Sequence, residues 1–176
     1  VLLGLLTVAP APARAQATQQ TKEYDNGGVY QGAFVDGRQH GRGTYKLPNG
    51  YEYTGDWVDG RIEGQGTAKF PNGSVYAGAF VDGHPQGKGR ITYADGGAYE
   101  GDWVAGRIEG KGVATYANGT RYEGAFVNGQ PSGTGELTGP DGYSYKGGWV
   151  AGVKAGRGRL ASPDGSVYEG EMANGV

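Results

Sequence analysis

The sequence contains no cysteine among its 176 residues, one methionine and two histidines. Without cysteine the chain has no disulfide framework, no thiolate metal site and no cysteine nucleophile. His40 and His84 stand apart from any further ligand motif. Because a metal site needs three or four converging ligands, we expect no metal and no cofactor.

Amphipathic helical patterns and an excess of basic charge are also missing. No long segment repeats apolar residues at helical spacing, which excludes a helical bundle and an α/β nucleotide-binding fold. Lysine and arginine number 16 against 18 aspartates and glutamates, so the net charge is −2. This balance argues against a globally basic nucleic-acid-binding protein.

Glycine and tyrosine are abundant instead, with 38 and 13 residues. We number each repeat from its first tyrosine, which is repeat position 1; glycine then recurs at positions 3, 8, 12, 14 and 21, and Phe or Trp at position 5 in six copies. A fixed period of about 20–50 residues is the signature of an array of units that stack on their neighbours. These tyrosines recur at intervals of 23 residues: Tyr30, Tyr53, Tyr76, Tyr99, Tyr122, Tyr145 and Tyr168.

Two turn signals divide each repeat, for example Asp59-Gly60 and Pro71-Asn72-Gly73. They predict an all-β fold, in which one β-hairpin per repeat continues an elongated, single-layer antiparallel sheet. We expect strands at positions 1–6 and 11–18, with position 5 opposite position 12 of the same hairpin. In that register Trp57 would lie over Gly64, and Gly64→Val would overpack the site.

The alternation of side chains places the aromatic residues on one face of this sheet. Large apolar patches seldom stay exposed, so we interpret this aromatic face as a candidate contact for a protein partner or a second copy. A core that the sheet forms by curling on itself is the alternative. The candidate residues are Tyr53, Trp57, Tyr76, Phe80, Tyr99, Trp103, Tyr122 and Phe126.

The opposite face carries a basic row with Lys88, Arg90 and Lys111, which are candidate contacts for anionic phospholipid. Basic residues near an anionic membrane contribute about 1 kcal/mol each. Acidic residues such as Glu100 and Asp102 share this face, so a solvated surface of mixed charge is the alternative.

Catalytic motifs are not recognisable. The segment Gly83 to Gly89 resembles a phosphate-binding loop, but it is one residue short, ends in glycine instead of serine or threonine and precedes a predicted strand. The carboxylates recur with the period of the scaffold. We therefore expect a protein that is not an enzyme and has no catalytic or cofactor-binding residues.

Residues 1–17 resemble the end of a secretory signal peptide, with an apolar stretch followed by small-x-small sites at Ala13-Arg14-Ala15 and Ala15-Gln16-Ala17. We expect a bacterial protein that is exported to the periplasm or secreted. Residues 18–29 then form an N-terminal half repeat, and residues 30–176 form six complete units and a truncated seventh.

The pattern Tyr53-x-Gly55-x-Trp57, followed by Gly60, Gly64-x-Gly66 and Asn72-Gly73, resembles the MORN (membrane occupation and recognition nexus) repeat. The resemblance implies a stack of hairpins in a twisted sheet with an aromatic-lined groove. MORN arrays are linked to oligomerisation, protein docking and acidic phospholipids, so we expect a non-catalytic scaffold. The alternatives are a regulatory segment of a larger enzyme and glycan binding in the groove that contains Trp57, Trp103 and Trp149.

Overall fold

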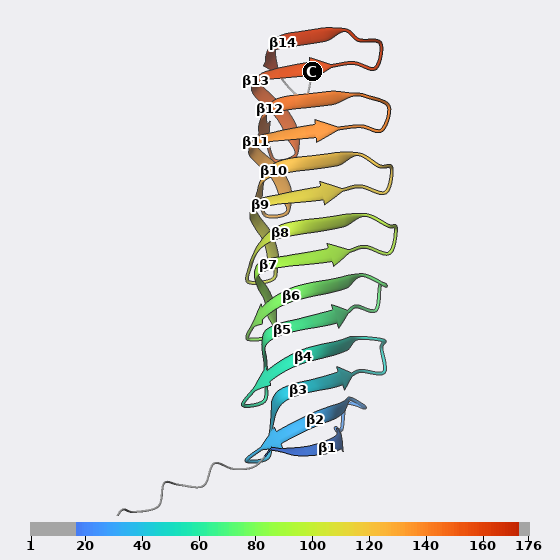
Figure 1. The fold of residues 1–176 in the computed structure, drawn as a ribbon, viewed down its shortest axis with the longest axis vertical. Helices are drawn as coiled ribbons and strands as arrows, with labels where there is room; N and C mark the ends of the chain where they lie inside the picture. The colour runs from blue at the N-terminus through green and yellow to red at the C-terminus, as the bar shows by residue number, and fades with distance from the viewer. Residues whose placement is uncertain (1–16, 173–176) are drawn as a thin grey trace, which may run out of the picture.

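The computed structural model describes residues 17–172, which form fourteen antiparallel strands in one sheet, in chain order from β1 to β14. The described residues contain no helix. The strands run across the long axis of the array, and a row of turns lines each side (Figure 1). The prediction of an all-β, single-layer hairpin array is confirmed. Apart from residue 17, the expected signal peptide lies outside the described residues, as does the end of the seventh repeat.

Each hairpin pairs a strand of seven residues with one of nine. The first strands are β2 (Val29–Val35), β4 (Glu52–Val58), β6 (Val75–Val81), β8 (Ala98–Val104), β10 (Arg121–Val127) and β12 (Ser144–Val150). The second strands are β3 (Arg38–Lys46), β5 (Arg61–Lys69), β7 (His84–Thr92), β9 (Arg107–Thr115), β11 (Gln130–Thr138) and β13 (Val153–Ala161). At the ends lie β1 (Thr18–Glu23) and β14 (Val167–Met172).

A two-residue turn closes each hairpin at positions 7 and 8. In the second repeat these residues are Asp59 and Gly60, with φ of 49° and 84°. Two successive positive φ values define a type I′ turn, whose twist matches that of the flanking strands. The second strand therefore begins at position 9, two residues earlier than the sequence predicted.

A β-bulge in each hairpin corrects the predicted register. In the second repeat Gly55 faces Gly66 as expected, but Trp57 faces Ile62 and not Gly64. Gly64 has a φ of 79° and belongs to the extra residues of the bulge. The residue opposite Trp57 on its other side is Gly41 of the preceding repeat. The prediction that Trp57 covers Gly64 is therefore wrong.

An aspartate at position 4 stabilises the bulge in two repeats. Asp56 Oδ2 accepts a hydrogen bond from the Gln65 amide at 2.9 Å, and Asp102 Oδ2 accepts one from the Lys111 amide at the same distance. The first, third and fifth repeats have alanine at position 4. This side-chain contact therefore distinguishes the second and fourth repeats from the first, third and fifth.

Gly64→Ala should therefore cost more stability than Gly87→Ala. Both glycines occupy position 12 with positive φ, where a Cβ adds about 1–2 kcal/mol of strain. A Cβ at Gly64 would also lie 2.8 Å from Asp56 Oδ2, whereas a Cβ at Gly87 would meet nothing within 4 Å. We expect a further loss of about 1 kcal/mol at Gly64, measured by urea denaturation. Equal losses would show that the aspartate contact contributes nothing.

The tyrosines at position 1 form the centre of the core. A Cβ added to Gly55 or Gly66 would overlap the Tyr53 ring, so the glycines at positions 3 and 14 make room for it. The Tyr53 hydroxyl donates to the Asp56 carbonyl at 3.0 Å. The same hydroxyl-to-carbonyl bond recurs in every repeat through Tyr168. The six tyrosines from Tyr30 to Tyr145 are thus enclosed by bare backbone and have their polar atom paired, whereas Tyr168, at the end of the sheet, is 50% exposed.

Edge-to-face contacts join these tyrosines into one aromatic core along the sheet. Tyr99 packs against Trp103 of its own hairpin at 5.6 Å between ring centroids and against Phe126 of the next at 5.0 Å. Tyr76 contacts Trp103 in the same way at 5.0 Å. Because the tyrosines from Tyr30 to Tyr122 each contact rings of two hairpins, the core is continuous from Tyr30 to Trp149.

Candidate functional site

The eight aromatic residues predicted as a binding face belong to this core. Their exposed fractions are only 0–6%. A partner in contact with the sheet therefore does not touch these rings directly, and the sheet covers them by packing ring against ring. The residues concerned are Tyr53, Trp57, Tyr76, Phe80, Tyr99, Trp103, Tyr122 and Phe126.

The tryptophans are equally enclosed. Trp57, Trp103 and Trp149 are 5–6% exposed, and each indole Nε1 donates to a glycine carbonyl of the preceding repeat at 3.1–3.3 Å. A sugar ring needs an open aromatic face for stacking. The burial of these three side chains therefore argues against the predicted glycan-binding groove.

Burial makes the core sensitive to alkaline pH. It raises the pKa of Tyr76 and Tyr122, and that of Tyr99, where Asp102 contributes, to about 12. In the unfolded chain the tyrosine hydroxyl groups lose their protons near their ordinary pKa of about 10. The stabilisation is therefore complete below pH 10 and is lost as the pH rises through about 12. Absorbance at 295 nm should show delayed ionisation that coincides with loss of the strand circular dichroism signal. Ionisation of these tyrosines with the fold intact would contradict this prediction.

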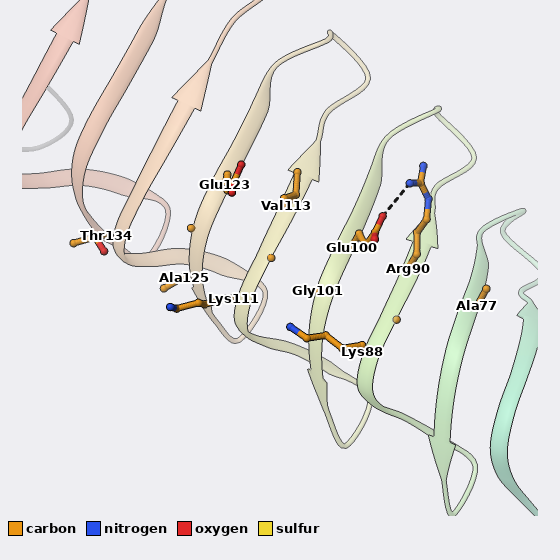
Figure 2. A pocket seen from close by; sticks show the side chains of 13 residues that line it. Ala77, Lys88, Arg90, Glu100, Gly101, Lys111, Val113, Glu123, Ala125 and Thr134 are labelled. Carbon is orange, nitrogen blue, oxygen red and sulfur yellow. Dashed lines mark hydrogen bonds and ion pairs between the residues drawn. The ribbon is translucent and has the colours of Figure 1, made fainter.

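The predicted lipid contacts lie together on the charged face, as Figure 2 shows. Lys88 Nζ pairs with Asp102 Oδ1 at 2.6 Å, and Arg90 pairs with Glu100 at 3.2 Å. The Lys88 ammonium group and the Lys111 amide hold the pKa of Asp102 below its usual value. Among the described residues, Lys111 has no carboxylate within 4.0 Å. Two of the three predicted cations are thus neutralised locally.

A shallow groove of about 800 Å³ runs over this face between the third and fifth repeats. Lys88, Arg90 and Lys111 line it together with Glu100 and Glu123, and backbone glycines of positions 3 and 14 form its floor. A second groove of about 820 Å³ extends over the fifth and sixth repeats. Both signs of charge line each groove, which suits a polar partner of mixed charge better than a strongly anionic one.

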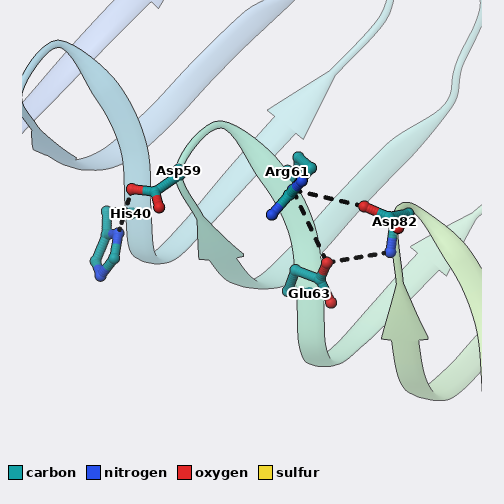
Figure 3. Close-up of polar contacts among 5 residues, drawn as sticks. All are labelled: His40, Asp59, Arg61, Glu63 and Asp82. Atoms are coloured by element: carbon teal, nitrogen blue, oxygen red, sulfur yellow. Dashed lines mark hydrogen bonds and ion pairs between the residues drawn. The ribbon is translucent and has the colours of Figure 1, made fainter.

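Side chains at position 11 link successive type I′ turns along one side of the array (Figure 3). Glu63 Oε1 accepts a hydrogen bond from the Asp82 amide at 3.3 Å, and Arg61 pairs with Asp82 at 3.5 Å. In the first repeat His40 takes the place of Glu63, with its Nδ1 3.7 Å from Asp59. Polar contacts between a hairpin and the type I′ turn of the next one therefore hold neighbouring hairpins together along this side of the array.

The turns between repeats, which form the right-hand row in Figure 1, carry a second set of aromatic rings. In six consecutive turns one of the two end residues is aromatic, and the other is leucine or a small residue; the last turn has serine at both ends. The two ends face each other through a backbone hydrogen bond. We call these rings the outer aromatic row: Tyr24, Tyr51, Phe70, Tyr93, Tyr116 and Tyr143.

The centre of the outer aromatic row is open to solvent. Tyr93 is 38% and Tyr116 is 42% exposed, whereas the other four rings are partly buried against the core. Burial, Asp95 and Tyr116 raise the pKa of Tyr93. The turn after that of Tyr116 begins with Gly139 and carries its ring at the other end, on Tyr143, which lines a hollow of about 290 Å³ together with Gly139 and Leu137.

The sequence analysis did not select this row as a site. The same rings occupy the ends of the strands, at position 18 in four turns and at position 22 in two. An inspection of position 18 alone, or of position 22 alone, therefore misses the pattern. The signal becomes visible when the two positions are considered together, because in each of six consecutive turns one or the other is aromatic.

Residues 17–172 offer little else that could act as a chemical site. No group of three or more His, Asp or Glu in this part of the chain is arranged to hold a metal ion. The same residues include no helix with the length and apolarity needed to cross a membrane.

A linear stack of identical hairpins around a continuous aromatic core defines the chain as a β-repeat protein. The family model of the MORN repeat matches residues 30–50, 53–75, 76–98, 99–121, 122–142 and 145–167. The chain therefore belongs to the MORN repeat family, as its sequence pattern indicated. No curated protein shows significant sequence similarity to it.

Solved structures with a similar fold come from another group of proteins. The TCP domain of Drosophila melanogaster SAS-4 (dCPAP), solved with a proline-rich motif of Ana2, is 13% identical. Its TM-score is 0.54, and the match covers 97% of this chain and 99% of that domain. The G-box domain of the microcephaly protein CPAP is 15% identical with a TM-score of 0.47, covering 87% and 74% of the two chains. At these identities the SAS-4 match establishes likeness of fold alone.

Proposed function

We propose that this protein is a non-catalytic scaffold that docks a partner protein along its sheet. The observation that carries the proposal is the outer aromatic row, whose central rings Tyr93 and Tyr116 are exposed on a rigid array. Exposed tyrosines supply contact area at a low entropic cost because they have few rotatable bonds. Membership of the MORN family and the partner-bound SAS-4 domain support this type of function.

The repeat geometry suits a partner that lies across several hairpins. Six consecutive turns each carry one ring of the outer aromatic row, so contacts of modest strength add up along an extended segment. The SAS-4 domain of similar fold was solved in complex with a proline-rich motif of Ana2. By analogy, the segment that docks here is an extended part of its own protein.

Export is part of the proposal. The segment before residue 18 has the apolar stretch and the cleavage signals of a secretory leader. The scaffold and its partner would then meet in the bacterial periplasm or outside the cell. Edman sequencing of the mature protein should begin near Gln16 or Thr18.

Site-specific photo-crosslinking tests the docking surface. A benzoylphenylalanine at position 116 should crosslink one protein in an extract of the source cells, and mass spectrometry identifies it. The same group at position 127 is the control, because Val127 is 51% exposed near the opposite row of turns. Crosslinks to the chain itself would identify the partner as a second copy. The absence of a crosslink specific to position 116 would contradict docking at this row.

Binding of anionic phospholipid by the charged face is a second candidate. Lys111 favours it, because its ammonium group has no carboxylate nearby among the described residues and lines the groove with Lys88 and Arg90. Replacing these three with glutamate should abolish sedimentation with phosphatidylglycerol vesicles, and about 0.5 M salt should do the same by screening. Binding that survives both changes would contradict an electrostatic contact.

A further inference from the structure

Three rings of the outer aromatic row have a regular spacing. Phe70, Tyr93 and Tyr116 all occupy repeat position 18, at the ends of β5, β7 and β9. Neighbouring rings of this set are therefore two strands apart, which corresponds to about 9.6 Å. The three rings span about 19 Å along the axis of the array.

This spacing selects the backbone conformation of a ligand. A polyproline II helix has three residues per turn and rises about 3.1 Å per residue, so it presents the same face every 9.3 Å or so. A β-strand presents the same face every two residues, at about 6.8 Å, and does not match. Over two intervals the polyproline II helix and the rings diverge by less than about 1 Å.

The surroundings of the rings also favour a ligand that carries positive charge. Asp95 and Asp141 lie in the turns on either side of Tyr116, and residues 71–74, 94–97 and 117–120 contain no lysine or arginine. One oxygen of each carboxylate accepts a backbone amide of its own turn, of Gly97 and Tyr143. Within residues 17–172 neither carboxylate forms an ion pair, so the other oxygen can pair with a cation of a ligand. Lys154 lies beyond this region and donates to the Tyr143 hydroxyl.

We propose that the outer aromatic row binds a proline-rich segment with flanking basic residues, which lies across the strands as a polyproline II helix. Residues i, i+3 and i+6 of the segment pack on Phe70, Tyr93 and Tyr116. Aromatic-lined surfaces bind such helices well because little conformational entropy is lost. The hollow at Gly139, which Leu137 and Tyr143 line, receives an apolar side chain three residues further on. This inference rests on the proposed docking function and names the chemistry of its partner.

Synthetic peptides test this inference. A heptaproline with an arginine at each end should shift the NMR aromatic signals of Tyr93 and Tyr116. Tyr93→Ser and Tyr116→Ser should each weaken binding at least fivefold, while Val81→Ser and Val127→Ser should leave it unchanged. Those valines are about half exposed, at 49% and 51%, and belong to position 6. Tetraproline with the same ends spans two rings and should bind at least fivefold more weakly.

Several results would overturn the inference. A glycine–serine peptide of equal length and charge that binds equally well would exclude selection of the polyproline II helix. If Asp95→Asn abolishes binding and the tyrosine variants do not, the contact is electrostatic adsorption. No signal shift at millimolar peptide would exclude the site itself. If a partner crosslinked at position 116 contacts it through a segment without proline, this inference fails and the docking function stands.

Discussion

Replacing Tyr99 with alanine should lower the free energy of unfolding by about 3–5 kcal/mol, the range for loss of a large buried aromatic side chain. Tyr99 is 1% exposed and contacts the rings of two hairpins. Its hydroxyl also satisfies the Asp102 carbonyl at 3.1 Å. The substitution leaves a cavity between the fourth and fifth repeats and an unpaired carbonyl beside it.

Tyr116→Ala is the matched control for Tyr99→Ala. The residue is also a tyrosine of the fourth repeat, but it is 42% exposed. We expect a loss of less than about 1 kcal/mol there, as for ordinary surface substitutions. Urea denaturation followed by circular dichroism measures both variants. A similar loss at the two positions would show that the continuous aromatic core does not stabilise the array.

Gly112→Ala should have the second-largest effect, about 1–3 kcal/mol, because it overpacks the same site. A Cβ on Gly112 would lie 2.5 Å from Tyr99 Cζ, and the Tyr99 ring is enclosed on all sides and cannot move away. Removing the ring should make room for the added methyl group. The double variant Tyr99→Ala/Gly112→Ala should therefore lose less stability than the two single variants together.

Gly96→Ala provides the control for this cycle. It lies in a turn with a φ of 89° and has nothing within 4 Å of an added Cβ, so its cost is backbone strain alone. It should add to Tyr99→Ala without coupling, since distant independent sites are additive. If the stability losses of Gly112→Ala and Tyr99→Ala are also additive, the tyrosine ring does not require glycine at position 14.

The regular features of the array were accessible from sequence because they depend on local chemistry. Asp59-Gly60 and Pro71-Asn72-Gly73 specify turns through their backbone preferences, and a turn on each side of a strand defines an antiparallel neighbour. The recurrence of Tyr53 and its equivalents every 23 residues then repeats one hairpin along a single axis. For the same reason the family could be identified from the pattern.

The β-bulge could not be predicted from the sequence in this way. The G-x-G at positions 12 and 14 is compatible both with a regular strand, as the sequence analysis assumed, and with a strand that takes up extra residues. Gly64 was therefore assigned to a contact with Trp57, although the ring that needs bare backbone is Tyr53, over Gly55 and Gly66. The choice depends on how the rings of neighbouring hairpins fit together.

The sequence by itself determined the all-β class, the length of the repeat, the turn positions and the division into an aromatic and a charged face. Only the tertiary structure decided which aromatic residues are buried. Period and alternation place Tyr99 and Tyr116 on the same face of the sheet, because side-chain direction along a strand is a local property. Their exposure differs because Tyr99 lies over glycine backbone between rings of two hairpins, whereas Tyr116 lies at the start of a turn between repeats and stays 42% exposed.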